Sequence, residues 1–307
     1  MSIQAKLYGV NPAVATPLTS ERDIDVPAYK KLIRRMVDAG CSGIMILGTA
    51  GEGFALDAKN YALAIQTAVE EINGEYPVLV CAGGFPMETV LKNMAAAYNL
   101  GADAILAVPP FYYPLPQNAV ADFYRELADK SKLPVLIYNI PALTKNAVEA
   151  ETVIQLSQEE NIVGLKDSSG DLAYMQKVVA YTDKDKFRVF QGRAPFFLAS
   201  LLFGAAGTQG PIPNIAPELE LGLHQAIKEG NMELAKSIQL KIMEIAKIFS
   251  YNGNPISTNL KGLMAALDIC EKYTAPTIPV LSDDKVKELG QKLASIVVSK
   301  NNETGQL

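Results

Sequence analysis

The 307-residue sequence contains one histidine, no tryptophan and only three cysteines. A site built on two or three imidazoles cannot form within one such chain, so zinc aldolases and Ser-His-Asp hydrolases are poor candidates. The single histidine, His224, lies in the charged segment PELELGLHQAIKEG, which predicts a solvated or half-buried position on a helix surface. Cys41, Cys81 and Cys270 lie far apart and form no CxxC pair, which indicates a reducing compartment and no metal cluster.

Excess positive charge and long hydrophobic runs are also lacking. The 28 Lys and Arg residues are outnumbered by 33 Asp and Glu residues, which disfavours the basic surface that nucleic-acid binding requires. The least polar stretch, 196–206, has 11 residues, well short of the ~20 that cross a bilayer, and we expect a buried helix leading into a strand. The first residues contain no apolar run of the kind found in signal peptides. The sequence therefore predicts a cytoplasmic protein with a small-molecule partner, and neither a nucleic-acid nor a membrane partner.

Short apolar runs alternate with helix-length amphipathic segments along most of the chain, which is typical of βα units around a parallel sheet. Eight runs are expected to be strands, at 8–16, 43–48, 77–83, 104–109, 134–139, 162–167, 187–192 and 206–210. Segments such as 26–40 and 57–74 carry apolar residues at three- and four-residue spacing, as helices do. Eight nearly continuous apolar strands favour a closed (β/α)8 TIM barrel over an open doubly wound sheet.

The strand signal stops after residue 210, and the end of the chain has the pattern of helices. Three helical segments are expected, at 231–250, 254–270 and 282–300. No low-complexity linker separates them from the preceding residues, so they are expected to pack with the barrel as one body. The sequence predicts an α/β protein with a catalytic barrel over 1–230 and a C-terminal helical region over 231–307.

In a TIM barrel the active site lies at the carboxyl ends of the strands. Lys166 is the only lysine that ends an apolar run. Burial there would favour the neutral amine, which attacks carbonyl groups, so Lys166 is a candidate Schiff-base lysine. The alternative is a structural lysine paired with Asp167 or Glu52. Asp167 points to the opposite face if the strand is extended, which favours a helix-capping or interface role for it.

Two further strand ends carry polar groups. Tyr138 ends the fifth run, and its phenol could transfer protons beside an imine-forming lysine, or it could be a core tyrosine with a satisfied hydroxyl. The GTAGEG turn at 48–53 offers backbone N–H groups and the Thr49 hydroxyl, a combination that can hold a carboxylate. Its glycine spacing fits neither the dinucleotide fingerprint nor the P-loop.

Four motifs occur in a characteristic order: GTAGE at 48–52, PPFYYP at 109–114, YNIPA at 138–142 and GLKDSSGD at 164–171. Together with the 28 residues between the tyrosine and the lysine, they resemble the dihydrodipicolinate synthase / N-acetylneuraminate lyase family of pyruvate-dependent class I aldolases. The resemblance extends over essentially the whole chain, from GVNPAVATPLT near the start to NPISTNLKGLM near the end.

The resemblance implies a distinct role for each of several site residues. Lys166 would form an imine with a 2-oxo acid, normally pyruvate, and Tyr138 would be the proton-transferring phenol. Thr49 and Tyr112 would complete a relay, with Tyr112 resembling the tyrosine that family members contribute across a dimer interface. The family pattern also implies a homotetramer built as a dimer of dimers, with no metal or organic cofactor.

For the substrate, the resemblance implies that the N–H groups of Thr49 and Ala50 bind the pyruvyl carboxylate and that the carbonyl near Gln209 faces the lysine. Ser168 and Tyr113 are further candidates for contact with the variable end of the substrate. In the family, a second threonine usually occupies the position of Ala50.

Two departures bear on the second substrate. Synthases that use aspartate semialdehyde typically carry an arginine where this chain has Leu143, and this weakens a role in lysine biosynthesis. YNIPAL resembles sialic acid lyases and 2-keto-3-deoxy sugar acid aldolases, but the acids that grip the sialic acid tail are missing from Gly192–Pro195. Arg193 in that segment could pair with an anionic group on the aldehyde or on a longer 2-oxo acid, or be a surface arginine at a strand end.

The sequence thus predicts a Schiff-base lyase or synthase that makes or breaks a C–C bond between pyruvate and an aldehyde. The substrate classes that it suggests are 2-keto-3-deoxy sugar acids and sialic-acid-like compounds. The alternatives are 4-hydroxy-tetrahydrodipicolinate synthase, a 2-keto-3-deoxy acid dehydratase that uses the same imine, and a non-catalytic protein that binds 2-oxo acids. A phosphate-binding isomerase barrel is disfavoured because residues 207–213 contain no basic side chain.

Overall fold

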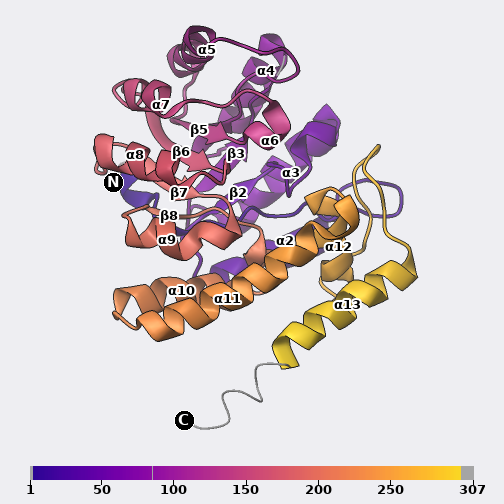
Figure 1. Ribbon diagram of the computed structural model, residues 1–307. Helices are drawn as coiled ribbons and strands as arrows, with labels where there is room; N and C mark the ends of the chain where they lie inside the picture. The colour runs from indigo at the N-terminus through magenta and orange to yellow at the C-terminus, as the bar shows by residue number, and fades with distance from the viewer. Residues whose placement is uncertain (1–2, 85, 299–307) are drawn as a thin grey trace.

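The computed structural model describes residues 3–84 and 86–298 and contains a parallel sheet at its centre (Figure 1). The eight strands are β1 (Gly9–Val10), β2 (Ile44–Ile46), β3 (Val78–Cys81), β4 (Ala104–Ala107), β5 (Val135–Asn139), β6 (Ile162–Asp167), β7 (Arg188–Gln191) and β8 (Gly207–Thr208). Each lies within one of the eight predicted runs. They are hydrogen-bonded in the order β1-β8-β7-β6-β5-β4-β3-β2. A parallel bridge between Ala13 and Met45 joins the two edges, and the predicted (β/α)8 barrel is confirmed.

Helices cover the outside of the barrel (Figure 1). They are α2 (Val26–Asp38), α3 (Ala58–Ile72), α4 (Met87–Asn99), α5 (Gln117–Lys130), α7 (Ala150–Leu156), α8 (Leu172–Tyr181), α9 (Phe197–Leu202) and α10 (Pro217–Lys228). Several begin at an aspartate whose side chain accepts a hydrogen bond from the first turn, as Asp25, Asp57 and Asp171 do for α2, α3 and α8. Because helices cover one face of each strand and the barrel interior the other, the strands are almost wholly apolar.

Short helical turns occur at both ends of the barrel. They are α1 (Ile3–Lys6), α6 (Pro141–Thr144), η1 (Gly53–Ala55), η2 (Ala194–Phe196), η3 (Ile212–Asn214) and η4 (Tyr251–Gly253). Three of them, η1, α6 and η2, directly follow the segments that end β2, β5 and β7, at the end of the barrel where the candidate residues lie.

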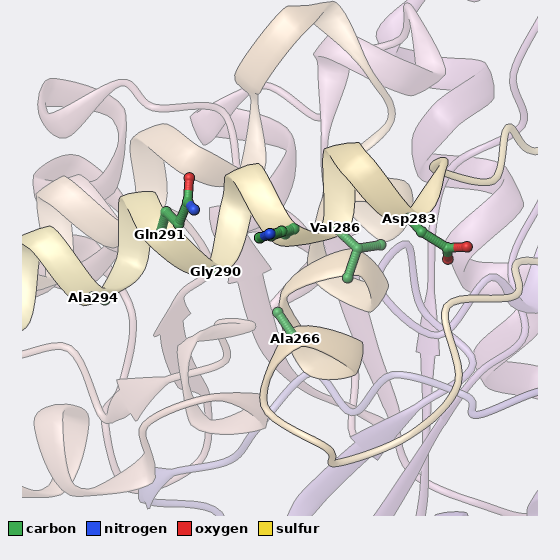
Figure 2. Close-up of a pocket in the computed structure, with 7 residues that line it drawn as sticks. Ala266, Asp283, Val286, Gly290, Gln291 and Ala294 are labelled. Atoms are coloured by element: carbon green, nitrogen blue, oxygen red, sulfur yellow. The ribbon is translucent and has the colours of Figure 1, made fainter.

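The C-terminal region consists of α11 (Met232–Phe249), α12 (Ile256–Ala266) and α13 (Asp283–Val298), in agreement with the three predicted helices. Helix α11 packs against α10, and α13 packs against α12. The last two helices approach closely, since a Cβ on Gly290 would lie 3.0 Å from the Cβ of Ala266. Figure 2 shows the shallow hollow beside this contact, which is lined by small and surface side chains and shares none of its lining with the cavity described below.

One detail of the prediction is wrong. The apolar stretch 196–206 does form α9 and lead into β8, but only its inner face is buried, through Phe197 and Ser200. Leu202 is 56% exposed and Phe203 is 47% exposed, because a helix on the barrel surface buries only the stripe that faces the strands. Among the described residues, no helix is long and apolar enough to cross a membrane.

Candidate active site

Lys166 and Tyr138 lie side by side inside the mouth of the barrel. The register of β5 and β6 pairs the two residues, so their side chains project from the same face of the sheet. The Lys166 side chain is buried, with Nζ 4.3 Å from the centroid of the Tyr138 ring and 3.3 Å from the sulfur of Met45. Within the described part of the chain, Lys166 forms no ion pair. The alternative that paired it with Asp167 or Glu52 is therefore wrong, and its amine is free to react.

Asp167 points away from the lysine, as its position on an extended strand predicts. Its carboxylate accepts hydrogen bonds from the Asn139 amide at 3.0 Å and from the N–H and hydroxyl of Ser169 at 3.1 and 2.9 Å. Burial raises the pKa of this carboxyl to about 6. The expected helix-capping role is wrong, because Asp171 caps α8. Asp167 instead fixes the loop that begins at Ser168.

The turn after β2 brings a hydroxyl to the phenol. Thr49 Oγ1 lies 3.4 Å from the Tyr138 hydroxyl, close enough to pass a proton after a small adjustment. The backbone N–H groups of Thr49 and Ala50 have no hydrogen-bond acceptor among the described residues. Two unpaired N–H groups beside a buried amine form a site suited to a carboxylate.

Glycines give this turn its shape. A Cβ on Gly51 would lie 2.8 Å from the Val14 carbonyl oxygen, and one on Gly53 would lie 2.1 Å from that of Leu47. Neither position can therefore accept a larger residue without moving the backbone. This is the packing reason behind the GTAGEG spacing.

A cavity of about 790 Å³ opens over the lysine. Seven of the predicted site residues line it: Thr49, Ala50, Tyr138, Lys166, Ser168, Arg193 and Gln209. Its outer wall includes residues of α11 and the start of α12, so the C-terminal region faces the cavity. The volume is ample for a small acid together with a second substrate.

Gly192 allows Ser168 and the lysine to lie close together. A Cβ at Gly192 would lie 2.2 Å from Ser168 Oγ and 3.0 Å from Lys166 Cε. The next residue, Arg193, is exposed at the cavity rim and makes no ion pair within the described residues. Leu143 also lines the rim and is 58% exposed.

Gln209 is fully buried, and neither atom of its side-chain amide has a hydrogen-bond partner among the described residues. An unpaired buried amide costs about 1–3 kcal/mol, which a polar group in the cavity could recover. The sequence analysis predicted only that the carbonyl near this residue faces the lysine. The structure shows that the Gln209 side-chain amide also lies at the cavity with no hydrogen-bond partner among the described residues.

The two tyrosines of the PPFYYP motif lie outside this cavity lining. Tyr112 follows β4, has a left-handed backbone with φ of 82°, and exposes 79% of its surface. Its ring contacts that of Tyr113 edge to face at a centroid distance of 5.1 Å. Within one chain Tyr112 does not reach Lys166, and Tyr113 does not reach the variable end of the cavity. A left-handed tyrosine is strained, which indicates that its position serves a purpose other than local folding.

The burial of Glu52 with Lys261, and that of Glu220, could not be predicted from the sequence motifs. Glu52 forms a fully buried ion pair with Lys261 of α12, and its partner is 209 residues away with no local signal to identify it. Glu220 of α10 is fully buried and accepts a hydrogen bond from the Thr208 hydroxyl at 2.7 Å. Its spacing of three residues from Pro217 and Leu223, both buried, is the signal that places it on the inner face.

Burial shifts the pKa values around Glu220 in opposite directions. It raises the pKa of the Glu220 carboxyl to about 8 and lowers the pKa of His224 to about 4. His224 is half-buried, as predicted, with Nε2 3.3 Å from the Thr208 hydroxyl. Both groups lie between β8 and α10 rather than in the cavity. No cluster of three or more His, Cys, Asp or Glu suited to a metal occurs among the described residues.

Comparison with known proteins identifies relatives along nearly the whole chain. Residues 6–296 match the dihydrodipicolinate synthetase family. The chain is 31% identical to a 4-hydroxy-tetrahydrodipicolinate synthase of Methanopyrus kandleri, over 92% of this chain and 94% of the relative. It is 28% identical to a probable 2-dehydro-3-deoxy-D-pentonate aldolase of Escherichia coli, over 91% of this chain and 94% of the relative.

The fold is also similar to solved structures. A prophage protein of the dihydrodipicolinic acid synthase family from Escherichia coli K12, solved in complex with pyruvate, superimposes with a TM-score of 0.90. The match covers 95% of this chain and 99% of that chain at 24% sequence identity.

Proposed function

The chain belongs to the dihydrodipicolinate synthetase family and is a pyruvate-dependent lyase, and from this premise we propose that Lys166 forms the imine with the 2-oxo acid. One observation carries the proposal. Lys166 is buried with no carboxylate partner in the part of the chain that the structure describes. It lies against the Tyr138 ring and faces a cavity large enough for two substrates. A structural lysine buried to this extent would be expected to have an ionic partner.

The proposed reaction begins with attack of the neutral Lys166 amine on the C2 ketone of pyruvate. The carbinolamine loses water, and the leaving hydroxyl takes its proton from the Tyr138 phenol. The Tyr138 phenolate then takes a proton from C3 while the iminium accepts the electron pair. The resulting enamine forms a C–C bond with the aldehyde carbon, and the Tyr138 phenol returns the proton to the aldehyde oxygen. Hydrolysis of the imine releases the product, and cleavage follows the same steps in reverse. Thr49, at 3.4 Å from the phenol, is the next member of the relay.

We assign recognition of the 2-oxo acid to the turn after β2. The N–H groups of Thr49 and Ala50 would bind the carboxylate, while Ser168 and the Gln209 amide would contact groups beyond C3. Arg193 would pair with an anionic group at the far end of the cavity. These roles are supported by the shared cavity lining and by the unpaired donors.

For the second substrate we favour an aldehyde released from a 2-keto-3-deoxy sugar acid or a related compound. Leu143 offers no charge to a second carboxylate, and one relative is a probable aldolase of this type. The alternative, synthesis of 4-hydroxy-tetrahydrodipicolinate, is supported by the Methanopyrus relative and by Arg193, which could replace the missing arginine. A dehydratase that uses the same imine remains a third candidate.

Turnover tests the proposal and separates these candidates. Purified protein would be given pyruvate with glyceraldehyde, glycolaldehyde or aspartate semialdehyde, and separately 2-keto-3-deoxygluconate or sialic acid for cleavage or dehydration. We expect turnover with at least one of them, and its loss in Lys166→Ala but not in the surface control Lys236→Met. Turnover that survives in Lys166→Ala would refute the imine. Pyruvate binding without turnover of any substrate would favour the non-catalytic alternative.

A further inference from the structure

We propose that Lys261 and Glu52 are positioning residues, and that their buried ion pair makes the C-terminal helix α12 hold the turn that receives the 2-oxo acid carboxylate. The inference rests on the proposed function for the identity of the ligand. It assigns to the C-terminal region a part in substrate affinity, although Lys261 itself does not line the cavity.

The ion pair is one of the most buried features of the molecule. Glu52 Oε1 lies 2.9 Å from Lys261 Nζ, and both side chains have no exposed surface. Lys261 also donates a hydrogen bond to the Tyr273 carbonyl at 2.7 Å, and the Ala275 N–H donates to Glu52 Oε2. The carboxylate of the turn is therefore tied to α12 and to the segment that follows it.

The turn needs such an anchor. Glu52 has a left-handed backbone with φ of 57°, a conformation that costs a residue with a side chain roughly 1–2 kcal/mol. Its N–H donates to the Thr49 carbonyl at 3.4 Å, so the conformation of Glu52 is coupled to the residue that offers an N–H to the substrate. On the other side, the Thr16 hydroxyl fixes the Gly51 carbonyl at 2.7 Å.

Removal of Lys261 would leave the Glu52 carboxylate buried without a counter-ion. Such an uncompensated charge is strongly unfavourable, so the turn would rearrange to let water reach it. The N–H groups of Thr49 and Ala50 would then lose their alignment. Tyr138 belongs to β5 and Lys166 to β6, which are other strands of the barrel, so the two residues would keep their geometry. Affinity for the 2-oxo acid should fall while the rate of imine formation at saturation is retained.

The test compares Lys261→Met with the double variant Glu52→Gln/Lys261→Met and with Lys236→Met, an exposed α11 lysine paired with Glu233. Two quantities are measured: hydrogen exchange of the peptide spanning 48–56, and the pyruvate concentration that half-saturates borohydride trapping. In Lys261→Met we expect faster exchange in this peptide. We also expect a half-saturating concentration raised about tenfold or more, with the trapping rate at saturation changed by less than about threefold. The double variant, which removes the orphaned charge, should recover part of the affinity.

Each outcome decides a separate point. One outcome is a Lys261→Met protein that melts at a lower temperature yet keeps the half-saturating pyruvate concentration and the hydrogen-exchange rate of the 48–56 peptide. That result would assign the ion pair a purely structural role and overturn the inference. Equal losses in Lys261→Met and Lys236→Met would overturn it as well. A third outcome separates the two proposals. If Lys261→Met exchanges faster at 48–56 but the unmodified protein traps no 2-oxo acid, the positioning of the turn is supported and the proposed function is refuted.

Discussion

Lys166 and Arg193 face the same cavity but differ in burial. Lys166 is 3% exposed and has no ionic partner among residues 3–84 and 86–298, whereas Arg193 is exposed at the rim. A buried amine beside a phenol is placed to attack a carbonyl group, while an exposed guanidinium can recognise an anion. We therefore assign chemistry to Lys166 and selection of the second substrate to Arg193.

Replacement of Arg193 tests this assignment. We expect Arg193→Ala to lower kcat/KM about tenfold for an acceptor that carries a carboxylate or phosphate, and to leave an uncharged acceptor nearly unaffected. The matched control is Lys247→Ala, which removes another cation from the cavity lining, one paired with Glu244 at 2.6 Å. Steady-state kinetics with both acceptor types measures the difference. An Arg193→Ala variant that kept its full kcat/KM for the best substrate would rule out the role.

Individual site residues were predictable from the sequence where they end an apolar run. Lys166 and Tyr138 could be found in this way because strand ends meet at the mouth of a parallel barrel. Tyr112 was identified only by family resemblance, and its exposed, left-handed position within one chain has no sequence signature of its own. Lys261 and Glu52 could not be paired in advance, because their contact depends on how the end of the chain folds back onto the barrel.

At the scale of packed elements, the contact between β8 and α10 contains the Glu220 carboxyl, which is protonated in the folded protein near neutral pH. Burial raises the pKa of Glu220 to about 8, whereas an unfolded chain would have a value of about 4.3. Between these values the folded state holds one more proton than the unfolded state, so stability falls as pH rises. His224, whose pKa is lowered to about 4 in the folded state, contributes a slope of the opposite sign that fades as pH rises above about 6.5. This slope is common to the unmodified protein and to a Glu220 variant.

Glu220→Gln removes this dependence. From pH 6.5 to 8, the unfolding free energy of the unmodified protein should fall relative to that of the variant by up to about 1.4 kcal/mol per pH unit. The amide oxygen of the Glu220→Gln variant can still accept the hydrogen bond from the Thr208 hydroxyl. The substitution therefore removes the titration of this side chain and changes little else. Denaturant unfolding at several pH values measures it. Parallel stability curves for the two proteins would show that Glu220 does not titrate in this range.

The elements themselves were the most predictable level of the structure. All eight strands lie within the predicted apolar runs, because strands covered on both faces must be apolar throughout. The helix surfaces were less predictable. The stretch 196–206 is apolar in sequence yet exposes Leu202 and Phe203, and the charged helix α10 turns Glu220 inward. Burial of single side chains depends on the neighbouring element, which local sequence does not specify.

For the whole molecule, we propose that 1–230 form the catalytic barrel and that the C-terminal region supports it. That region was predicted over 231–307, of which 299–307 lie outside the described residues. We also propose that the active form is a dimer within a tetramer. Tyr112 extends from the barrel with 79% of its surface exposed, a position suited to a neighbouring subunit's site. If it acts there, a subunit lacking Tyr112 and a subunit lacking Lys166 can together build one intact site.

Complementation tests the shared site. Tyr112→Phe and Lys166→Ala, each far less active than the unmodified protein, would be co-expressed with different tags and the mixed assemblies isolated. We expect each isolated mixed dimer to regain about half of full activity, since one of its two sites carries both substitutions and the other neither. Activity no higher than the average of the two parent variants would place Tyr112 outside the partner's site.

The central claim, imine formation at Lys166, is tested most directly by chemical trapping. The protein would be incubated with pyruvate, reduced with borohydride, digested, and the modified peptide located by mass. We expect a single reduced pyruvyl adduct on Lys166, absent from Lys166→Ala. An adduct on another lysine, or none with pyruvate or any other 2-oxo acid, would contradict it.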